Sequence, residues 1–352
     1  MAGCGTLMIT SLKLENFRIF TGLEIAPLKP INLFAGANNT GKTCILEALY
    51  LLFGDQAQLQ QLPSAFRSTL STPSQPNFSD DFATFWQALF YDRQTQAPGF
   101  FYARTEPDKV LVCRVEGTLN NLIQLFYEQR GTTLAITNFS NVGLPPSFSI
   151  SNHGHSTHGT NPFAKKLIVL STRLEHPTRD AELYNQLVLS EGCEEKLLQL
   201  LRVIDPRLQR LRYAKPPGTS QPLVYASFAG LKNALSMTQT GQGFSKLFSL
   251  FCQMLVSKAE LLLIDEIENG LYYETMPQIW KGIATLAASE KIQVFATTHS
   301  RECLIAAHET MKTMPSYDFA LHRLQRVNGR LEAVTHDQGM LEVALKSGLE
   351  VR

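Results

Sequence analysis

Apolar and polar positions alternate with two different periods along the chain, and these periods predict a mixture of strands and helices. Residues 9–20 alternate in part, and residues 31–35 form a short apolar run that ends at a glycine, so both segments are predicted strands. Residues 43–53 instead repeat their apolar positions every three or four residues, which places them on one face of a helix. The chain is therefore expected to begin with strands and then enter a helix.

The middle of the chain combines β-rich runs with polar stretches. Residues 110–115, 122–128 and 132–137 are separated by glycine or asparagine, which is typical of an antiparallel meander. Residues 56–79 are rich in Gln, Ser and Pro and carry a single charged residue, so we expect a surface insertion there. Residues 81–91 are expected to form a short amphipathic helix.

A long loop and then an alternation of helices and strands are predicted for the second half. Residues 137–163 contain no Lys, Arg, Asp or Glu and many Ser, Asn, Gly and Pro residues, so we expect a mobile loop. A buried strand at 167–170, helical periodicity over 180–204 and a strand at 223–228 follow. Residues 243–298 then alternate helix, strand, helix, strand, the rhythm of a parallel sheet.

The last part of the chain predicts a hairpin and a helix. The pair Asn328-Gly329 is a strong signal for a two-residue turn, and it lies between the predicted strands 319–327 and 330–334. A short helix is expected after them.

The overall composition is that of a globular protein and narrows the function classes. The chain has 352 residues, of which 44% are hydrophobic and 18% charged, so a wholly disordered chain is excluded. The 32 Lys and Arg residues are balanced by 31 Asp and Glu residues. This balance argues against a strongly basic nucleic-acid binder and leaves a local basic patch as the route to such binding.

Cysteine usage and hydropathy favour a cytoplasmic protein. The six cysteines are scattered and include no Cys-x-x-Cys pair, as expected for free thiols in a reducing compartment. Residues 1–13 do not show the charged region and long apolar run of a signal peptide. No stretch reaches about 18 apolar residues without a charge, so no membrane partner is expected.

One segment fits a phosphate-binding loop in full. Residues 36–43 match G-x-x-x-x-G-K-[ST], and they follow an apolar strand and open a helix, as that motif requires. Glycines let such a loop curl so that backbone N–H groups surround phosphate oxygens. Lys42 is expected to reach the β- and γ-phosphates, and the Thr43 hydroxyl to bind Mg²⁺. The candidate nucleotide-binding residues here are Gly36, Asn38, Asn39, Thr40, Gly41, Lys42 and Thr43.

A second segment supplies the carboxylates that such a site needs. Residues 261–264 are consecutive apolar residues, and Asp265 and Glu266 follow them directly. Because parallel α/β sheets bind ligands at the carboxyl ends of their strands, Asp265 is the candidate Mg²⁺ ligand beside Thr43. Glu266 is the candidate general base that polarises an attacking water. The alternative, a strand that merely ends in carboxylates, loses weight because the phosphate loop is present.

The separation of these two segments along the chain indicates the class of NTPase. Thr43 and Asp265 must reach the same Mg²⁺ although most of the chain lies between them. Small GTPases keep these elements much closer together, and the chain has no Asn-Lys-x-Asp motif to recognise guanine, so ATP is the expected nucleotide. A large insertion between the two halves is typical of ABC-type ATPase heads.

Two further elements fit an ABC-type head. Residues 294–300 form another apolar strand that ends in polar residues, and His299 among them is expected to donate to the γ-phosphate or to position the water. Gly241 and Gly243 open a predicted helix whose backbone N–H groups can bind an anion. In ABC-type heads this element serves the nucleotide of the opposite subunit.

These motifs together resemble the standalone AAA-family ATPases that are grouped with the RecF, SMC-like and OLD-type ABC ATPases. The matching segments are residues 14–18, 36–43, 241–246, 264–271 and 296–303. The resemblance implies a two-lobed head that encloses two ATP molecules, with Mg²⁺, in a head-to-tail homodimer. It implies catalytic roles for Lys42, Glu266 and His299, metal ligation by Thr43 and Asp265, nucleotide contacts from Gly241 and Gly243, and a place for Asn269 at the subunit junction.

The expected fold is α/β: a P-loop NTPase of the ABC-head type, with a mostly parallel core sheet, an antiparallel β subdomain and a helical lobe. We expect residues 1–352 to form one composite head. Its parts would be a lobe with the phosphate loop and antiparallel strands at about 1–175, a helical region at about 176–235, a catalytic region at about 236–310, and a carboxyl-terminal hairpin and helix at about 311–352.

One basic segment leaves nucleic-acid binding open. Residues 196–215 carry several cations that can contact DNA or RNA phosphates, although a solvated helix face explains the same pattern. These cations are Lys196, Arg202, Arg207, Arg210, Arg212 and Lys215.

The predicted function is an ATP-binding and ATP-hydrolysing switch, a slow ATPase that dimerises around two Mg-ATP and regulates a partner protein or nucleic acid. Two alternatives stay open. One is a nucleotide-gated scaffold for a separate effector nuclease in antiviral defence, and the other is a DNA-binding ATPase of DNA repair or chromosome maintenance.

Overall fold

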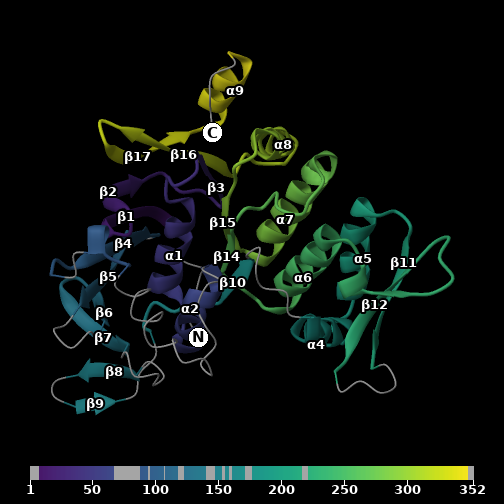
Figure 1. Ribbon diagram of the computed structural model, residues 1–352, viewed down its shortest axis with the longest axis horizontal. Helices are drawn as coiled ribbons and strands as arrows, with labels where there is room; N and C mark the ends of the chain where they lie inside the picture. Colours follow the sequence, from purple (N-terminus) through teal and green to yellow (C-terminus); the bar gives the residue numbers. More distant parts are fainter. Residues whose placement is uncertain are drawn as a thin grey trace.

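In the computed structural model, the described residues form three β-sheets with helices between them (Figure 1). The structure describes residues 8–66, 88–93, 96–106, 108–117, 123–139, 147–152, 155–157, 161–170, 177–215 and 221–347.

A six-stranded sheet forms the centre of the molecule. Its five leading strands are mutually parallel, and the sixth pairs antiparallel at one edge, so the predicted mostly parallel core sheet is confirmed. Its strands are, in order, β10 (Leu167–Leu170), β14 (Leu261–Ile264), β15 (Gln293–Thr297), β3 (Ile31–Gly36), β16 (Phe319–Val327) and β17 (Arg330–His336).

The register of this sheet brings three strand ends to one edge. Ile264 pairs with Ala296, and Ala296 pairs with Leu33, so β14, β15 and β3 finish side by side. In parallel sheets the ligand site lies at this carboxyl edge. The segments that follow these strands, although far apart in the sequence, are therefore neighbours in space.

The central sheet separates two hydrophobic cores. On β3, Leu33 and Ala35 face one core and Phe34 faces the other, as the alternation of a strand requires. Helix α1 (Lys42–Phe53) packs on the Phe34 face. The opposite face is covered by three helices (Figure 1): α6 (Gln242–Val256), α7 (Met276–Glu290) and α8 (Arg301–Lys312).

A second, antiparallel sheet lies beside α1 (Figure 1). The predicted meander is confirmed, because β5, β6 and β7 are consecutive neighbours in it. The predicted strand 9–20 is split, since a turn separates β1 from β2. The strand order is β2 (Phe20–Ile25), β1 (Ile9–Phe17), β4 (Gly99–Thr105), β5 (Lys109–Gly117), β6 (Ile123–Gln129), β7 (Thr132–Phe139), β8 (Ser147–Asn152) and β9 (His155–Thr157).

Two predicted loops contain regular structure instead. The loop expected over 137–163 is wrong in part, because β8 and β9 lie within it and extend the sheet beyond β7. Such edge strands gain their stability from pairing with a neighbour, which a local pattern does not reveal. The surface insertion expected over 56–79 is also wrong in part, since α2 (Gln56–Phe66) buries Leu59 and Leu62. Residues 67–79, and 81–87 of the predicted helix 81–91, lie outside the described residues.

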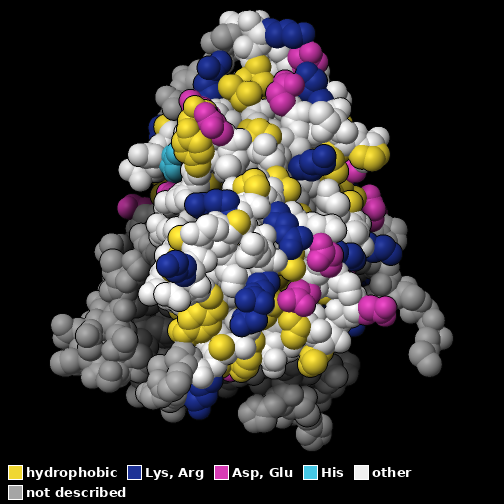
Figure 2. Space-filling model, turned by 90° about the vertical axis from the view of Figure 1, so that its right-hand side faces the viewer, with side chains coloured by type: hydrophobic (Ala, Val, Ile, Leu, Met, Phe, Trp, Pro, Cys, Tyr) yellow, Lys and Arg dark blue, Asp and Glu magenta, His cyan; other side chains and the backbone are white. Residues whose placement is uncertain are grey.

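The described residues of the region 177–236 form a lobe beyond α6, and their apolar side chains share one core with α6 and α7 (Figure 1). Its helices are α4 (Pro177–Val188) and α5 (Cys193–Ile204), where helical periodicity was predicted. A small antiparallel sheet also belongs to it, formed by β11 (Leu208–Ala214), β12 (Leu223–Phe228) and β13 (Leu235–Ser236). Figure 2 views the molecule from this side and shows Lys and Arg side chains interspersed with Asp and Glu.

The chain ends in the predicted hairpin and helix. Asn328 and Gly329 have φ of 49° and 80°, the two positive values that a tight turn of this kind requires. They join β16 to β17, and α9 (Gln338–Lys346) follows. Among the described residues, no helix has both the length and the apolar character needed to cross a bilayer.

Candidate active site

The phosphate loop lies between β3 and α1 at the carboxyl edge of the central sheet. Gly36 must be glycine because an added Cβ would lie 2.6 Å from the backbone oxygen of Leu324 on β16. Asn39 and Gly41 have φ of 61° and 87°, so the loop curls through the left-handed region. Helix α1 has neither a side-chain cap nor an acidic residue in its first turn. Its free N–H groups and positive dipole end therefore favour a bound anion.

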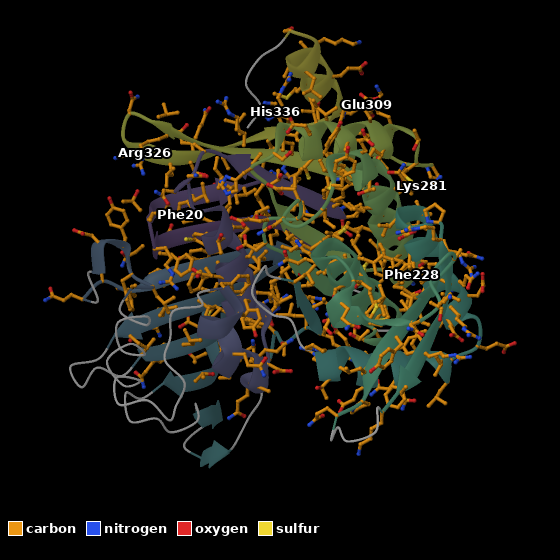
Figure 3. All side chains as sticks on the ribbon, turned by 45° about the vertical axis from the view of Figure 1, so that its right-hand side comes forward. Phe20, Phe228, Lys281, Glu309, Arg326 and His336 are labelled. Atoms are coloured by element: carbon orange, nitrogen blue, oxygen red, sulfur yellow. The ribbon has the colours of Figure 1, made fainter. Side chains whose placement is uncertain are left out.

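The hairpin between β1 and β2 packs directly on this loop. An added Cβ on Gly41 would lie 2.4 Å from Cζ of Phe20 and 2.9 Å from Cδ1 of Ile19. Phe20 is fully buried at the start of β2 (Figure 3). A buried ion pair, Arg18 Nε to Glu47 Oε2 at 2.8 Å, ties the same hairpin to α1. This contact gives a structural role to the first segment that carries the resemblance.

Lys42 is buried in the loop and turns back onto it. Its Nζ donates to the backbone oxygens of Gly36 at 2.7 Å and Ala37 at 2.8 Å. Burial lowers the pKa of Lys42 to about 8, and the carboxylates of Asp265, Glu268 and Glu266 oppose that shift. The ammonium is held by neutral carbonyl oxygens, so an incoming anionic phosphate is a stronger acceptor for it.

Thr43 and Asp265 meet across the site as predicted. Thr43 Oγ1 donates to the Asp265 carboxylate, at 3.1 Å from Oδ1 and 3.2 Å from Oδ2. A hydroxyl beside a carboxylate is a set of hard oxygen donors, which suits Mg²⁺. The described residues hold no group of three or more His, Cys, Asp or Glu side chains that could enclose a metal by themselves. The hydroxyl of Thr43 and the carboxylate of Asp265 fit a Mg²⁺ that also binds waters and phosphate oxygens.

Thr297, the last residue of β15, joins the two adjacent carboxylate residues. Its Oγ1 donates to Asp265 Oδ1 at 2.7 Å and accepts the backbone N–H of Glu266 at 2.8 Å. Burial raises the pKa of Asp265, and the hydroxyls of Thr297 and Thr43 oppose that shift. Thr297 thereby sets the position of both carboxylates relative to the sheet.

Glu266 and His299 face each other at the open side of the site. His299 Nε2 lies 3.7 Å from Glu266 Oε1, and the two side chains are 35% and 41% exposed, respectively. Asn269 Nδ2 donates to Glu266 Oε2 at 3.5 Å. A carboxylate that is partly exposed and next to an imidazole can accept a proton from a water molecule held between them.

Glu268 holds the segment that carries His299. Its Oε1 accepts the backbone N–H of His299 at 2.6 Å and that of Ser300 at 3.1 Å. Ser300 in turn caps α8, because its Oγ accepts the N–H of Cys303 at 3.0 Å. The backbone position of His299 therefore depends on the contacts made by Glu268 and Ser300, and not on contacts of the imidazole ring.

Gly241 and Gly243 lie at the start of α6, and Gly243 contacts the loop after Glu266. An added Cβ on Gly243 would lie 2.2 Å from the backbone oxygen of Gly270. An added Cβ on Gly241 would meet nothing within 4 Å, so this glycine faces open space. The structure thus separates the predicted residues into one cluster, Lys42, Thr43, Asp265, Glu266 and His299, and a second group at the α6 start.

The remaining loop residues divide by exposure. Asn38 and Asn39 are exposed, whereas Thr40 is buried and its Oγ1 donates to the backbone oxygen of Ala37 at 2.8 Å. Three residues of the site were given no role from the sequence: Thr297, Glu268 and Lys246. Thr297 carries a signal that the sequence offers, since it ends the strand next to the one that Asp265 follows.

Comparison with known protein families gives a match for each of two segments of the chain. Residues 8–115 match the family described as "AAA ATPase domain". Residues 129–304, half of the chain, match the family described as "AAA domain, putative AbiEii toxin, Type IV TA system". The second match contains the α6 start, both carboxylates and His299.

Individual proteins give a consistent result. The chain is 24% identical to an "ATP/GTP phosphatase" of Helicobacter pylori over 84% of its length and 86% of that protein. It is 42% identical to the DNA replication and repair protein RecF of Nitrosococcus oceani, but over only 18% of each chain. The head domain of Smc from Pyrococcus furiosus, bound to a domain of ScpA, superposes with a TM-score of 0.55, at 14% identity over 97% of this chain and 98% of that one. Another SMC head, bound to the C-winged helix domain of ScpA, gives 0.52 at 14% identity, over 96% of this chain and 99% of that one.

Proposed function

The chain belongs to the AAA-domain family of P-loop ATPases, in the RecF/SMC-like ABC group, and on this premise we propose that it is a Mg-ATP-dependent switch that closes as a head-to-tail dimer around two nucleotides. The observation that carries this proposal is the contact of Thr43 with Asp265, at 3.1 Å between Oγ1 and Oδ1. It supplies both protein ligands for one Mg²⁺ beside the phosphate loop, with Glu266 next in the chain.

The site supports the following division of roles. Lys42 and the start of α1 would bind the β- and γ-phosphates. Thr43 and Asp265 would hold Mg²⁺, which neutralises phosphate charge when bound. Glu266 would accept the proton of the attacking water, and His299 would hold that water or donate to the γ-phosphate.

We infer the need for a second subunit from the parts of the site that remain exposed in a single chain. Glu266 and His299 are both more than a third exposed, whereas hydrolysis benefits from a site closed to bulk water. The start of α6, where Gly241 faces open space, is a free anion-binding helix end. In a head-to-tail pair, the α6 start of one protomer would cover the γ-phosphate bound by its partner.

Two variants test this proposal. Lys42→Ala should abolish ATP binding, because it removes the phosphate-binding ammonium. Glu266→Gln should bind ATP without hydrolysing it and should accumulate as a dimer. Molar mass by light scattering, with and without Mg-ATP, measures the outcome. A Glu266→Gln protein that stays monomeric at saturating Mg-ATP would refute the dimer, and a wild type that does not hydrolyse ATP would refute the ATPase.

A DNA-binding role is a second candidate, favoured by exposed cations on the α5–β11 side. Arg202 and Arg207 are engaged by Glu195 and Asp205. The remaining cations of the predicted segment are exposed: Lys196, Arg210, Arg212 and Lys215. If they contact DNA phosphates, binding should weaken steeply between 50 and 200 mM salt, and Arg210→Glu with Arg212→Glu should abolish it. Absence of binding at low salt would remove this candidate.

A separate effector protein, such as a nuclease, is the other proposed partner. The support is that SMC heads of similar fold have been solved with a domain of ScpA bound. A partner that reads the nucleotide state should co-purify with Glu266→Gln in Mg-ATP and not with Lys42→Ala. Equal recovery with both variants would argue against nucleotide gating.

A further inference from the structure

Lys246, on the first turns of α6, reaches the loop that carries Glu266. Its Nζ donates to three backbone oxygens, those of Glu266 at 3.1 Å, Ile267 at 3.3 Å and Asn269 at 3.1 Å. An ammonium has three donors. One lysine therefore gathers the carbonyl groups of a whole turn.

This turn needs external support because of its backbone conformation. Glu266 has φ of 48°, in the left-handed region that residues other than glycine adopt only at an energetic cost. Thr297 accepts the N–H of Glu266, and Lys246 donates to its carbonyl oxygen. The two peptide groups that flank the general base are thus held from opposite sides, one by the sheet and one by α6.

A second contact packs the start of α6 closely against this loop. Gly243, one turn before Lys246, approaches Gly270 so closely that an added Cβ would lie 2.2 Å from the Gly270 oxygen. The helix start therefore contacts the loop from Glu266 to Asn269 through Lys246 and at Gly270 through Gly243. A shift of the α6 start would displace the loop along this whole length.

We propose that Lys246 is a positioning residue for Glu266, and that it links the anion-binding start of α6 to the general base of the same protomer. The link rests on the proposed function, since the α6 start is assigned there to the partner's nucleotide. ATP held by one protomer would then order Glu266 in the other through Lys246. Neither lysine nor loop needs to contact that nucleotide for the effect.

The chemistry of the contact favours positioning over simple stabilisation. Lys246 is half-buried, and burial lowers its pKa to about 8. Its three contacts are with backbone oxygens, so they fix the backbone conformation of the loop. A lysine that served only to stabilise charge would instead make a direct contact with a carboxylate.

The test compares three substitutions with a control. Lys246→Met removes the ammonium and keeps the apolar stem, Lys246→Gln keeps two donors, and Lys246→Arg keeps the charge. Lys281→Met is the control, since Lys281 is exposed on the neighbouring helix α7 (Figure 3). The measurements are kcat, the Kd for Mg-ATP, and amide hydrogen exchange of residues 266–271 without nucleotide.

Lys246→Met should lower kcat by about 10- to 100-fold, the size expected when a reacting group is misplaced by about 1 Å. The Kd for ATP should change less than about twofold, because the phosphate loop is untouched. Exchange at 266–271 should accelerate while that of 261–264 does not. Lys246→Gln should show a smaller loss, Lys246→Arg should recover most of the activity, and Lys281→Met should match the wild type.

Three outcomes would overturn the inference. The first is unchanged exchange at 266–271, and the second is an unchanged kcat in a folded Lys246→Met protein. The third is a loss of kcat that Lys246→Arg fails to restore and that accompanies equal losses of ATP affinity and thermal stability. The exchange measurement needs no nucleotide, so it tests Lys246 even if the dimer proposal fails. Conversely, a Glu266→Gln protein that traps the dimer, alongside a fully active Lys246→Met, would overturn the inference and leave the proposed function standing.

Discussion

Thr297 is hydrogen-bonded to Asp265, with 2.7 Å between Thr297 Oγ1 and Asp265 Oδ1, although Thr297 ends β15 and Asp265 follows β14. The same hydroxyl accepts the N–H of Glu266. A single side chain on β15 thus fixes the positions of the candidate metal ligand and the candidate general base, which directly follow β14. Thr297 is therefore a residue of the central sheet that directly contacts both candidate carboxylate residues.

Thr297→Val should therefore reduce both stability and Mg²⁺ use. The variant keeps the shape of the side chain, but leaves the N–H of Glu266 without its acceptor, which costs about 1–3 kcal/mol of unfolding free energy. The Mg²⁺ concentration for half-maximal ATPase activity should rise. Thr105→Val is the control, because the buried Thr105 hydroxyl has no hydrogen-bond partner among the described residues. Equal losses in both variants would contradict the role given to Thr297.

Gly41→Ala should weaken ATP binding more than the backbone strain alone explains. The added Cβ would collide with Phe20, so the phosphate loop must move. Gly192→Ala provides the comparison, since Gly192 has a similar φ of 73° with nothing within 4 Å of an added Cβ. Both variants should lose about 1–2 kcal/mol of unfolding free energy from the left-handed backbone. Only Gly41→Ala should lose a further amount and also bind ATP at least tenfold more weakly, as measured by calorimetry.

Two glycines at the α6 start should respond differently to alanine. Gly243→Ala forces the helix away from the Gly270 carbonyl, and overpacking of this kind costs about 1–3 kcal/mol. Gly241→Ala meets no neighbour and should cost less than about 1 kcal/mol. Chemical unfolding without nucleotide separates the two, because no dimer contact then contributes. Equal stabilities would show that the start of α6 and the loop are not tightly packed.

The buried His322 should make the fold sensitive to acid. Its ring lies between Asn32 and Thr335, and burial lowers its pKa from 6.5 to about 3. The unfolded chain therefore takes up a proton before the folded protein does. Stability is complete above about pH 6.5 and is lost as the pH falls from 6.5 toward 3, with a slope of up to about 1.4 kcal/mol per pH unit.

His322→Gln removes this titration and should flatten the pH dependence in that window. The measurement is the unfolding free energy of both proteins at several pH values between 4 and 8. Parallel curves would show that other groups cause the acid sensitivity.

The chemistry of the site was readable from the sequence wherever it depends on neighbours in the chain. The phosphate loop is one contiguous motif, and Asp265 and Glu266 follow directly after a buried strand. His299 was found in the same way. These residues meet because parallel strands end at a common edge, which is a general rule and needs no knowledge of this particular chain.

The parts that escaped prediction depend on contacts between distant segments. The target of Lys246 is set by the rotation of α6 and by the approach of Gly243 to Gly270, neither of which has a local signature. The buried face of α2 was hidden among Gln residues, and β8 and β9 are stabilised by the sheet that they join. The packing of Phe20 on Gly41 likewise follows from the turn of the β1–β2 hairpin.

The place of β3 in the central sheet has a consequence for synthesis of the protein. β3 ends at Gly36, yet its two neighbours, β15 and β16, begin at Gln293 and Phe319. At about 5–20 residues per second, a nascent chain carries this strand, all of whose residues are buried in the folded protein, without a partner for more than about ten seconds. The central sheet can be completed only after β16 and β17 have been synthesised, so until then β3 exposes side chains that the folded protein buries.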